Sequence, residues 1–168
     1  ILSLIAIITL LAGEFAAFSS QKSREVLLYS SIAQSGLVVV LFVNGLSTAA
    51  VLVILGNVVA KMILFTIAGT VCEDGQSDDI DGLRGMFKEK FVLGIAFTVA
   101  AMSLTGLPLF FGLFVNLNVL IGLFAIGKLW IPIIVLVASL IEGAYFIRIL
   151  VKLWNPGEEG IIPSGAVK

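Results

Sequence analysis

Long runs of apolar residues cover most of the chain, and polar segments separate them. A membrane-spanning helix needs about 20 predominantly apolar residues, and several runs approach or exceed that length. The pattern therefore predicts an all-α integral membrane protein with five transmembrane helices. The predicted helices are 1–19, 26–43, 49–71, 91–126 and 129–151.

The polar segments indicate one transmembrane domain at 1–151 and a C-terminal tail at 152–168. Two connections are short, "SQKSRE" and "NGLST", and the only long polar connection is 72–90. Residues 1–19 lack the basic region and the small-residue cleavage site of a signal peptide. We therefore interpret them as a spanning helix. Because the sequence begins with Ile1 instead of Met, it is either a natural half-subunit or one piece of a longer protein.

The fourth run, 91–126, is too long for one straight crossing. At about 1.5 Å per residue it would far exceed a hydrocarbon layer of about 30 Å. Gly106, Pro108 and Gly112 interrupt it, because proline lacks a backbone donor and glycine adds backbone freedom. The run is therefore either one crossing made of two half-helices or a hairpin of two crossings.

The basic residues distinguish these two alternatives. Cytoplasmic loops of membrane proteins carry an excess of lysine and arginine. A single broken crossing leaves only Lys128 on one side of the membrane. The opposite side then carries Lys22, Arg24, Arg84, Lys88, Lys90, Arg148, Lys152 and Lys168. We therefore expect a multi-pass protein of the cell membrane, with the fourth helix broken at 106–112, a cytoplasmic loop at 72–90 and a cytoplasmic C-terminus.

The composition agrees with a membrane protein and disfavours several other classes. Hydrophobic residues make up 60% of the chain and charged residues 12%, whereas soluble domains are about half apolar and a quarter charged. The net charge of −1 provides no basic field for nucleic acid. With no histidine and one cysteine, Cys72, the chain lacks the usual ligands of zinc, haem and iron–sulfur clusters. We therefore expect no cofactor, no metal ion, no catalytic residue and no redox active site in this chain.

Several polar residues lie inside the predicted membrane helices. A charged side chain at the centre of a spanning helix costs about 2.5–3.5 kcal/mol on insertion scales. Lys61 lies near the middle of the third helix, one turn after Asn57, while Glu14 lies in the first helix and Glu142 near the centre of the fifth. Such groups face a bundle interior or a hydrated cavity, so they indicate a path for protons or cations.

These residues also have purely structural interpretations. Lys61 and one of the two glutamates would form a buried ion pair that joins helices. Glu14 would alternatively lie at the level of the lipid headgroups, and Asn57 would form a hydrogen bond between helices. The acidic residues of the long loop have the pattern of a solvated face. The second helix carries a polar stripe that also suits close helix packing, formed by Ser30, Ser31, Gln34 and Ser35.

Four segments resemble motifs of the antiporter-like membrane subunit family. That family comprises subunits of respiratory complex I, of membrane-bound hydrogenase-type complexes and of Mrp-type sodium/proton antiporters. The segment "REVLLYSSIAQSG" (24–36) resembles the pattern "KRLLAYSSIxQxG", and "GNVVAKMILFTIAG" (56–69) resembles "NHAxFKAxLFLxAG". The segment 79–114 is similar to the family's broken helix with its preceding loop, and "SLIEGAYFIRIL" (139–150) to the helix that follows.

The resemblance implies one antiporter-like repeat of five helices, the second of two inverted repeats in the family's subunits. Each repeat resembles a half-channel, and Lys61 matches a lysine that carries protons there. Arg24 replaces the lysine of the first motif, whereas Asn57 stands where the family usually has histidine. Asn116 stands where the broken helix usually carries lysine or glutamate, and Leu109 replaces a second proline. Two titratable positions of the family are therefore amides in this chain.

Two functions follow as hypotheses. In the first, the chain is a membrane subunit of a multi-subunit ion-translocating complex and forms a half-channel for proton or sodium/proton transport. Its predicted ion path consists of Lys61, Glu142, Arg24, Glu14, Asn57 and Asn116. In the second, the chain is a degenerate, non-conducting subunit that scaffolds or seals the membrane arm of such a complex. Both imply the lipid bilayer and other membrane subunits as partners, including one that supplies the first repeat or adjacent antiporter-like subunits.

Overall fold

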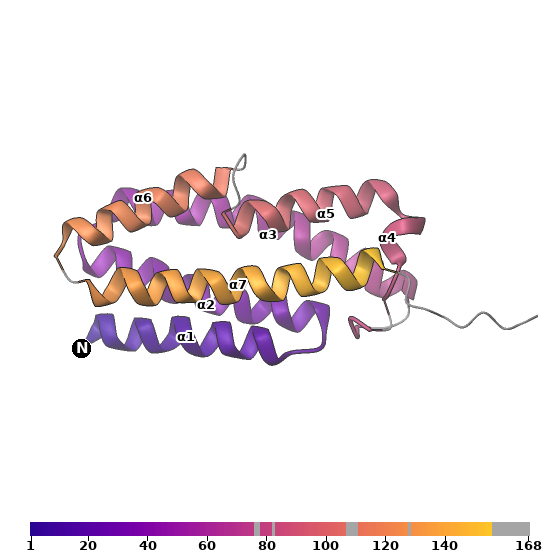
Figure 1. Cartoon of the computed structure of the whole chain (residues 1–168), viewed down its shortest axis with the longest axis horizontal. Coiled ribbons are helices and arrows are strands. Elements are labelled where there is room, and N and C mark those ends of the chain that lie inside the picture. The colour runs from indigo at the N-terminus through magenta and orange to yellow at the C-terminus, as the bar shows by residue number, and fades with distance from the viewer. Residues whose placement is uncertain (76–77, 82, 107–110, 128, 156–168) are drawn as a thin grey trace, which may run out of the picture.

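The computed structural model describes residues 1–75, 78–81, 83–106, 111–127 and 129–155. The regular structure of these residues is helical, apart from one isolated bridge between Lys22 and Asp79. The helices are α1 (Leu2–Ser19), α2 (Ser23–Val43), α3 (Ser47–Gly75), α4 (Met86–Glu89), α5 (Phe91–Leu104), α6 (Phe111–Ala125) and α7 (Trp130–Trp154). The long helices run along the longest axis of the molecule (Figure 1). The prediction of an all-α protein is confirmed.

Helices α1, α2, α3 and α7 are long and apolar enough to cross a membrane. Their outward faces carry large apolar side chains: Ile8 is 65% exposed, Val59 63% and Leu140 68%. Contiguous apolar surface of this kind is unfavourable in water but is matched by the hydrocarbon of a bilayer. Length and surface therefore agree with an integral membrane protein.

The predicted fourth run forms two shorter apolar helices, α5 and α6, of 14 and 15 residues. They follow each other along one side of the molecule, where both contact α3 (Figure 1). After α5 ends at Leu104, Gly106 takes a φ of 72°, a conformation that glycine adopts without steric cost. Pro108, the proline of the predicted break, lies outside the described residues.

Three helices extend beyond the boundaries that the apolar runs predict. Helix α2 begins at Ser23 instead of residue 26, α3 continues to Gly75 instead of residue 71, and α7 continues to Trp154 instead of residue 151. Hydropathy marks the part of a helix that suits hydrocarbon. Backbone hydrogen bonding continues into the interfacial layer, where polar side chains are tolerated. The helices are therefore longer than their apolar runs.

Glycines allow α1 and α2 to approach each other closely. A Cβ atom on Gly13 would lie 2.7 Å from the Ala33 backbone nitrogen, and one on Gly36 would lie 2.7 Å from the Ala6 carbonyl oxygen. Small residues let helix backbones pack tightly in membranes, where apolar burial does little to drive helices together. The two glycines therefore fix the position of α1 on the bundle.

The long polar loop folds back over the ends of α1 and α2. The described carboxylates of Glu73, Asp78, Asp79, Asp81 and Glu89 are exposed, as the solvated-face interpretation expects. In contrast, Ile80 is 0% exposed, Leu83 1% and Phe87 0%. The Ile80 amide donates to the Gln21 carbonyl oxygen at 2.9 Å, and the Ser23 amide donates to the Asp78 carbonyl oxygen at 3.0 Å. Apolar burial and backbone pairing therefore anchor the loop to the bundle.

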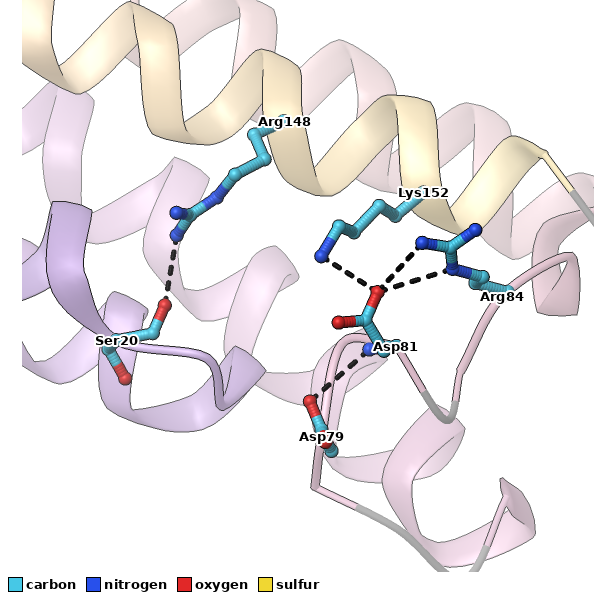
Figure 2. A network of polar contacts seen from close by, with 6 residues as sticks. All are labelled: Ser20, Asp79, Asp81, Arg84, Arg148 and Lys152. Carbon is cyan, nitrogen blue, oxygen red and sulfur yellow. Dashed lines mark hydrogen bonds and ion pairs between the residues drawn. The ribbon is translucent and has the colours of Figure 1, made fainter. Parts of the chain in front are cut away.

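Asp81 connects this loop to the end of α7 (Figure 2). Its Oδ1 lies 2.7 Å from Lys152 Nζ and 3.0 Å from Arg84 Nη2. One turn earlier on α7, Arg148 Nη2 donates to the Ser20 carbonyl oxygen at 2.9 Å. Hydrogen bonds from Lys152 and Arg84 lower the pKa of Asp81. Helix α7 is therefore attached both to the loop and to the α1–α2 connection.

Replacing Gly36 by alanine should destabilise the protein. The added methyl would overlap backbone atoms of α1, and overpacking of this kind costs about 1–3 kcal/mol. Gly143→Ala is the matched control, because no atom lies within 4 Å of its added Cβ. Denaturant unfolding of the purified protein in mixed micelles measures both variants. Equal stability of the two variants would contradict the close α1–α2 contact.

Acidification should release the loop through Asp81. Because the folded-state pKa of Asp81 is lowered, its stabilising contribution is present above the ordinary carboxyl pKa and is lost as the pH falls through the lowered value. We expect Asp81→Asn to reduce the hydrogen-exchange protection factor of the Ile80 amide at neutral pH and to remove its dependence on acid pH. Glu89→Gln, at an exposed position of α4, should leave both unchanged. If the protection of the Ile80 amide keeps the same dependence on acid pH in Asp81→Asn, Asp81 is not the group that anchors the loop.

Candidate functional site

A group of polar side chains lies inside the bundle where α1, α2, α3 and α7 come together. Their spacing places them on inward faces, since residues three or four apart share one side of a helix. Glu14 comes from α1. We refer to the group as the membrane polar cluster, which consists of Glu14, Ser30, Ser31, Gln34, Asn57, Lys61, Glu142 and Tyr145.

Glu142 on α7 is only 3% exposed, but it receives more hydrogen bonds from the described residues than the other carboxylate of the cluster, Glu14. Gln34 Nε2 donates to its Oε1 at 3.1 Å and to its Oε2 at 3.0 Å. Ser30 Oγ lies 3.5 Å from Oε1 as a third, longer contact. A buried carboxylate needs such donors in place of water. The polar stripe of α2 therefore supplies the local solvation of Glu142.

Gln34 also connects this carboxylate to α3. Asn57 Nδ2 donates to Gln34 Oε1 at 3.3 Å and to the Val53 carbonyl oxygen at 2.9 Å. The structural interpretation of Asn57 as a hydrogen bond between helices is therefore correct in its geometry. Its Oδ1 is buried without a hydrogen-bond partner among the described residues.

Lys61 lies one turn further along α3 and is 8% exposed. Its Nζ donates to Ser31 Oγ at 3.2 Å. Among the described residues no carboxylate oxygen lies within 4 Å of this nitrogen, but Glu142 and Glu14 both lie within its electrostatic reach. The ammonium therefore interacts with the two carboxylates electrostatically over a longer distance, without the direct ion pair of the structural interpretation.

Glu14 and Tyr145 are the most deeply buried titratable residues of the cluster, at 1% and 0% exposed. Glu14 Oε2 and the Tyr145 hydroxyl have no hydrogen-bond partner among the described residues. The hydroxyl nevertheless lies beside Glu14 and Ser30 and within electrostatic reach of Glu142. Glu14 is thus buried inside the bundle.

Asn116 on α6 lies next to the cluster but does not belong to it. Its side chain packs over Gly106, where an added Cβ would collide with Asn116 Nδ2. Asn116, Gln34 and Asn57 line a small cavity of about 20 Å³, with Ser103 also in its wall. That volume accommodates about one water molecule. The cavity therefore joins the cluster to the interruption between α5 and α6.

Arg24 lies elsewhere. Its Nε is 3.4 Å from Asp78 Oδ1 in an ion pair that is about half exposed, at 44% and 48%. This position is at the loop end of α2, two to three turns from Ser31 and Gln34. The structure thus gathers Lys61, Glu142, Glu14 and Asn57, brings Asn116 near them, and leaves Arg24 at the edge of the bundle.

The cluster opens toward a groove of about 440 Å³ between α2 and α3. The charged residues of the cluster were predicted from the sequence, but no separate role was predicted for Gln34 or Tyr145. A signal for each was present, since Gln34 follows Ser30 by four residues and Tyr145 follows Glu142 by three. The polar wall of the groove is formed by Ser31, Gln34, Ser35, Asn57 and Lys61.

The chemical groups of the cluster suit proton exchange. Carboxylate, ammonium, hydroxyl and amide groups lie near one another within a site largely shielded from bulk water, where proton affinities respond strongly to neighbouring charge. Within the part of the chain that the structure describes, no three His, Cys, Asp or Glu side chains gather in a way that could hold a metal ion.

Comparisons with known proteins agree with this chemistry. Residues 1–142 match the family model described as "NADH:quinone oxidoreductase/Mrp antiporter, TM". "NADH-quinone oxidoreductase subunit N" of Nitrosomonas europaea is 28% identical over 167 residues, which cover 96% of this chain and 34% of the relative. The subunit of the same name from Brevibacillus brevis is 24% identical over 171 residues, covering 98% and 34%. The chain thus spans about a third of the length of the curated relatives it matches.

Solved structures show the same fold. A chain of the membrane-bound sulfane sulfur reductase, an archaeal respiratory membrane complex, matches with a TM-score of 0.85 and 26% identity over 95% of this chain and 33% of its own length. A chain of respiratory complex I from Thermus thermophilus matches with a TM-score of 0.75 and 26% identity, covering 95% and 36%. These shares fit one repeat of a larger antiporter-like subunit. The chain belongs to the antiporter-like membrane subunit family of respiratory complex I and Mrp antiporters.

Proposed function

We propose that this chain contributes a half-channel for proton or sodium/proton transport to a multi-subunit membrane complex. The observation that carries the proposal is that Lys61 and Glu142 are buried in membrane-spanning helices within electrostatic reach of each other, and that each is hydrogen-bonded to the polar stripe of α2, Lys61 to Ser31 and Glu142 to Gln34. Ionisable groups at this depth are expensive and mark ion paths. Electron transfer, if the complex is redox-driven, would belong to partner subunits.

The proposed half-channel has five crossings, with α5 and α6 together forming the fourth. Each of the two would be about 21–23 Å long at 1.5 Å per residue, which is shorter than a hydrocarbon layer of about 30 Å. Their end-to-end arrangement along α3 favours one broken crossing over a hairpin (Figure 1). Half-helix ends inside the membrane commonly lie at transport sites.

The proposed orientation places the loop and the C-terminus in the cytoplasm. Arg24, Arg84 and Lys152 all contact carboxylates of the long loop, so the basic residues gather at one end of the bundle. An excess of lysine and arginine marks the cytoplasmic side. The acidic partners do not counter this assignment, because acidic residues contribute little to the rule.

In the proposed path Lys61 is the central proton carrier. Its ammonium gives a proton to the Glu142 carboxylate through the intervening polar groups or a water molecule, which leaves a neutral amine and a neutral carboxyl. The path then continues past Asn57 to Asn116 and the helix break through the small cavity. Because the two amides do not titrate, they would hold water and would not carry the proton. Arg24 would tune the potential at the loop end.

The α2–α3 groove indicates where partner subunits lie. Ser35 and the neighbouring polar side chains of its wall cannot face lipid without cost. We propose that another membrane subunit or the first repeat of the same kind of protein covers this groove, with lipid on the apolar remainder. About two thirds of each relative lies outside the region that matches this chain, which is enough additional length for such a segment.

A second candidate function is a non-conducting subunit that scaffolds or seals the membrane arm. Asn57 and Asn116 favour this function, because both line the cavity and their amide side chains do not titrate. The hydrogen bonds that hold Glu142 on Gln34 would then serve to join α2 and α7. In this case the cluster would be structural throughout.

Lys61→Ala should separate the two functions. In vesicles that contain the complete parent complex, we expect ion pumping to fall by roughly tenfold or more, because a central proton carrier has no substitute. Lys88→Ala, at an exposed position of α4, should leave pumping unchanged. Quenching of a pH-sensitive dye measures pumping, and native gel electrophoresis measures assembly.

Unchanged pumping in Lys61→Ala would overturn the half-channel. Tolerance of Lys61→Met, together with loss of the complex when the chain is deleted, would establish the scaffold. Intact assembly without the chain would count against the scaffold.

A further inference from the structure

The membrane polar cluster holds one more acidic group than the proposed path uses. Glu14 on α1 and Glu142 on α7 are both buried, at 1% and 3% exposed, and each lies within electrostatic reach of the other and of Lys61. Two ionised carboxylates and one ammonium would leave a net negative charge inside the membrane. Like charges in one dry site cannot both ionise without a large penalty, so such pairs retain a proton.

Charge from other helices does not relieve this excess. The described parts of α5 and α6 contain no titratable residue. Arg148, one turn beyond Tyr145 on α7, is engaged by the Ser20 carbonyl oxygen and lies over the Phe18 ring. Lys61 is the cation that acts on both carboxylates. One bound proton therefore brings the cluster to neutrality.

The two carboxyl groups differ in how well their charged forms are stabilised. Glu142 accepts two hydrogen bonds from Gln34 and one longer contact from Ser30, which favours its ionised form. Glu14 Oε2 has no donor among the described residues. A protonated carboxyl group is itself a hydrogen-bond donor. Protonated Glu14 would therefore need only one acceptor nearby, whereas ionised Glu14 would need donors that its Oε2 lacks in the described part of the chain.

The Tyr145 hydroxyl supplies that acceptor. It is fully buried, has no hydrogen-bond partner among the described residues, and lies beside Glu14 and Ser30. A proton on Glu14 would be donated to the tyrosine oxygen, and the tyrosine proton would point toward Ser30. The chain of hydroxyls then ends at Glu142, to which Ser30 donates.

We propose that Glu14 and Glu142 form a proton-binding acid pair in which Glu14 holds the proton and Glu142 remains ionised opposite Lys61. Binding of the proton stands independently of transport. Its use as a proton reservoir in transport rests on the proposed half-channel. In that use the Tyr145–Ser30 chain relays the one proton from Glu14 to the Glu142 carboxylate, which leaves Glu14 ionised and Glu142 neutral while Lys61 keeps its proton.

Infrared spectroscopy of the full natural protein in its membrane complex tests the number of protonated carboxyls. At neutral pH the carbonyl stretch of a protonated glutamate should be present with the intensity of one group, and ¹³C-glutamate labelling should shift it in the unaltered protein. Glu14→Gln should abolish the band. Lys61→Met should double it, because loss of the ammonium leaves no charge to hold Glu142 ionised. Glu89→Gln, in the exposed part of α4, should not alter it.

The result separates this proposal from the proposed function. Lys61→Met should stop transport in a half-channel whatever the band shows, whereas the band count does not depend on transport. Absence of the band in the unaltered protein, or its survival in Glu14→Gln, would overturn the acid pair. So would a band present in choline chloride and lost in sodium chloride, which would identify a bound sodium ion in place of the proton.

Discussion

Hydrocarbon offers no hydrogen bonds, and the arrangement of this protein follows from that constraint. Each polar group within the membrane must find its partner in the protein. Glu142 and Gln34 meet this requirement most completely, with contacts of 3.0 and 3.1 Å between α7 and α2. Gln34 then accepts from Asn57 on α3. One amide side chain thus sets the relative position of three helices and gives the bundle a polar interior.

The two ends of the polar interior differ in construction. Toward the loop, Asp81, Lys152 and the apolar anchors of the loop close the bundle with contacts that are partly in water. Toward α5 and α6, a small cavity leads to Asn116 at the interruption. Charged side chains are therefore concentrated at the loop end of the bundle, whereas neutral amide side chains lie near its middle. Such an asymmetry suits a device that has a defined direction across the membrane.

Much of the fold could be predicted from the sequence because hydrocarbon makes the signal strong. Because Lys61 lies inside a long apolar run, a position on the buried face of a membrane helix is nearly the only arrangement that avoids exposing its charge to lipid. The break near Gly106 was visible because glycine and proline interrupt an apolar run too long for one crossing. The loop was harder, since Ile80, Leu83 and Phe87 are spaced among carboxylates and have no membrane to mark their burial. The partners of Glu14 depend on how α1 packs against α2 and α7, which no local pattern encodes.

The glycine contact between α1 and α2 has a further consequence for any charge held in the bundle. Gly13 is the residue before Glu14, and it brings the α1 backbone against Ala33. A larger residue there would open a seam beside the most weakly solvated carboxylate. Water entering such a seam would short-circuit the membrane potential across the subunit. The close contacts at the two glycines therefore limit the entry of water and ions between α1 and α2.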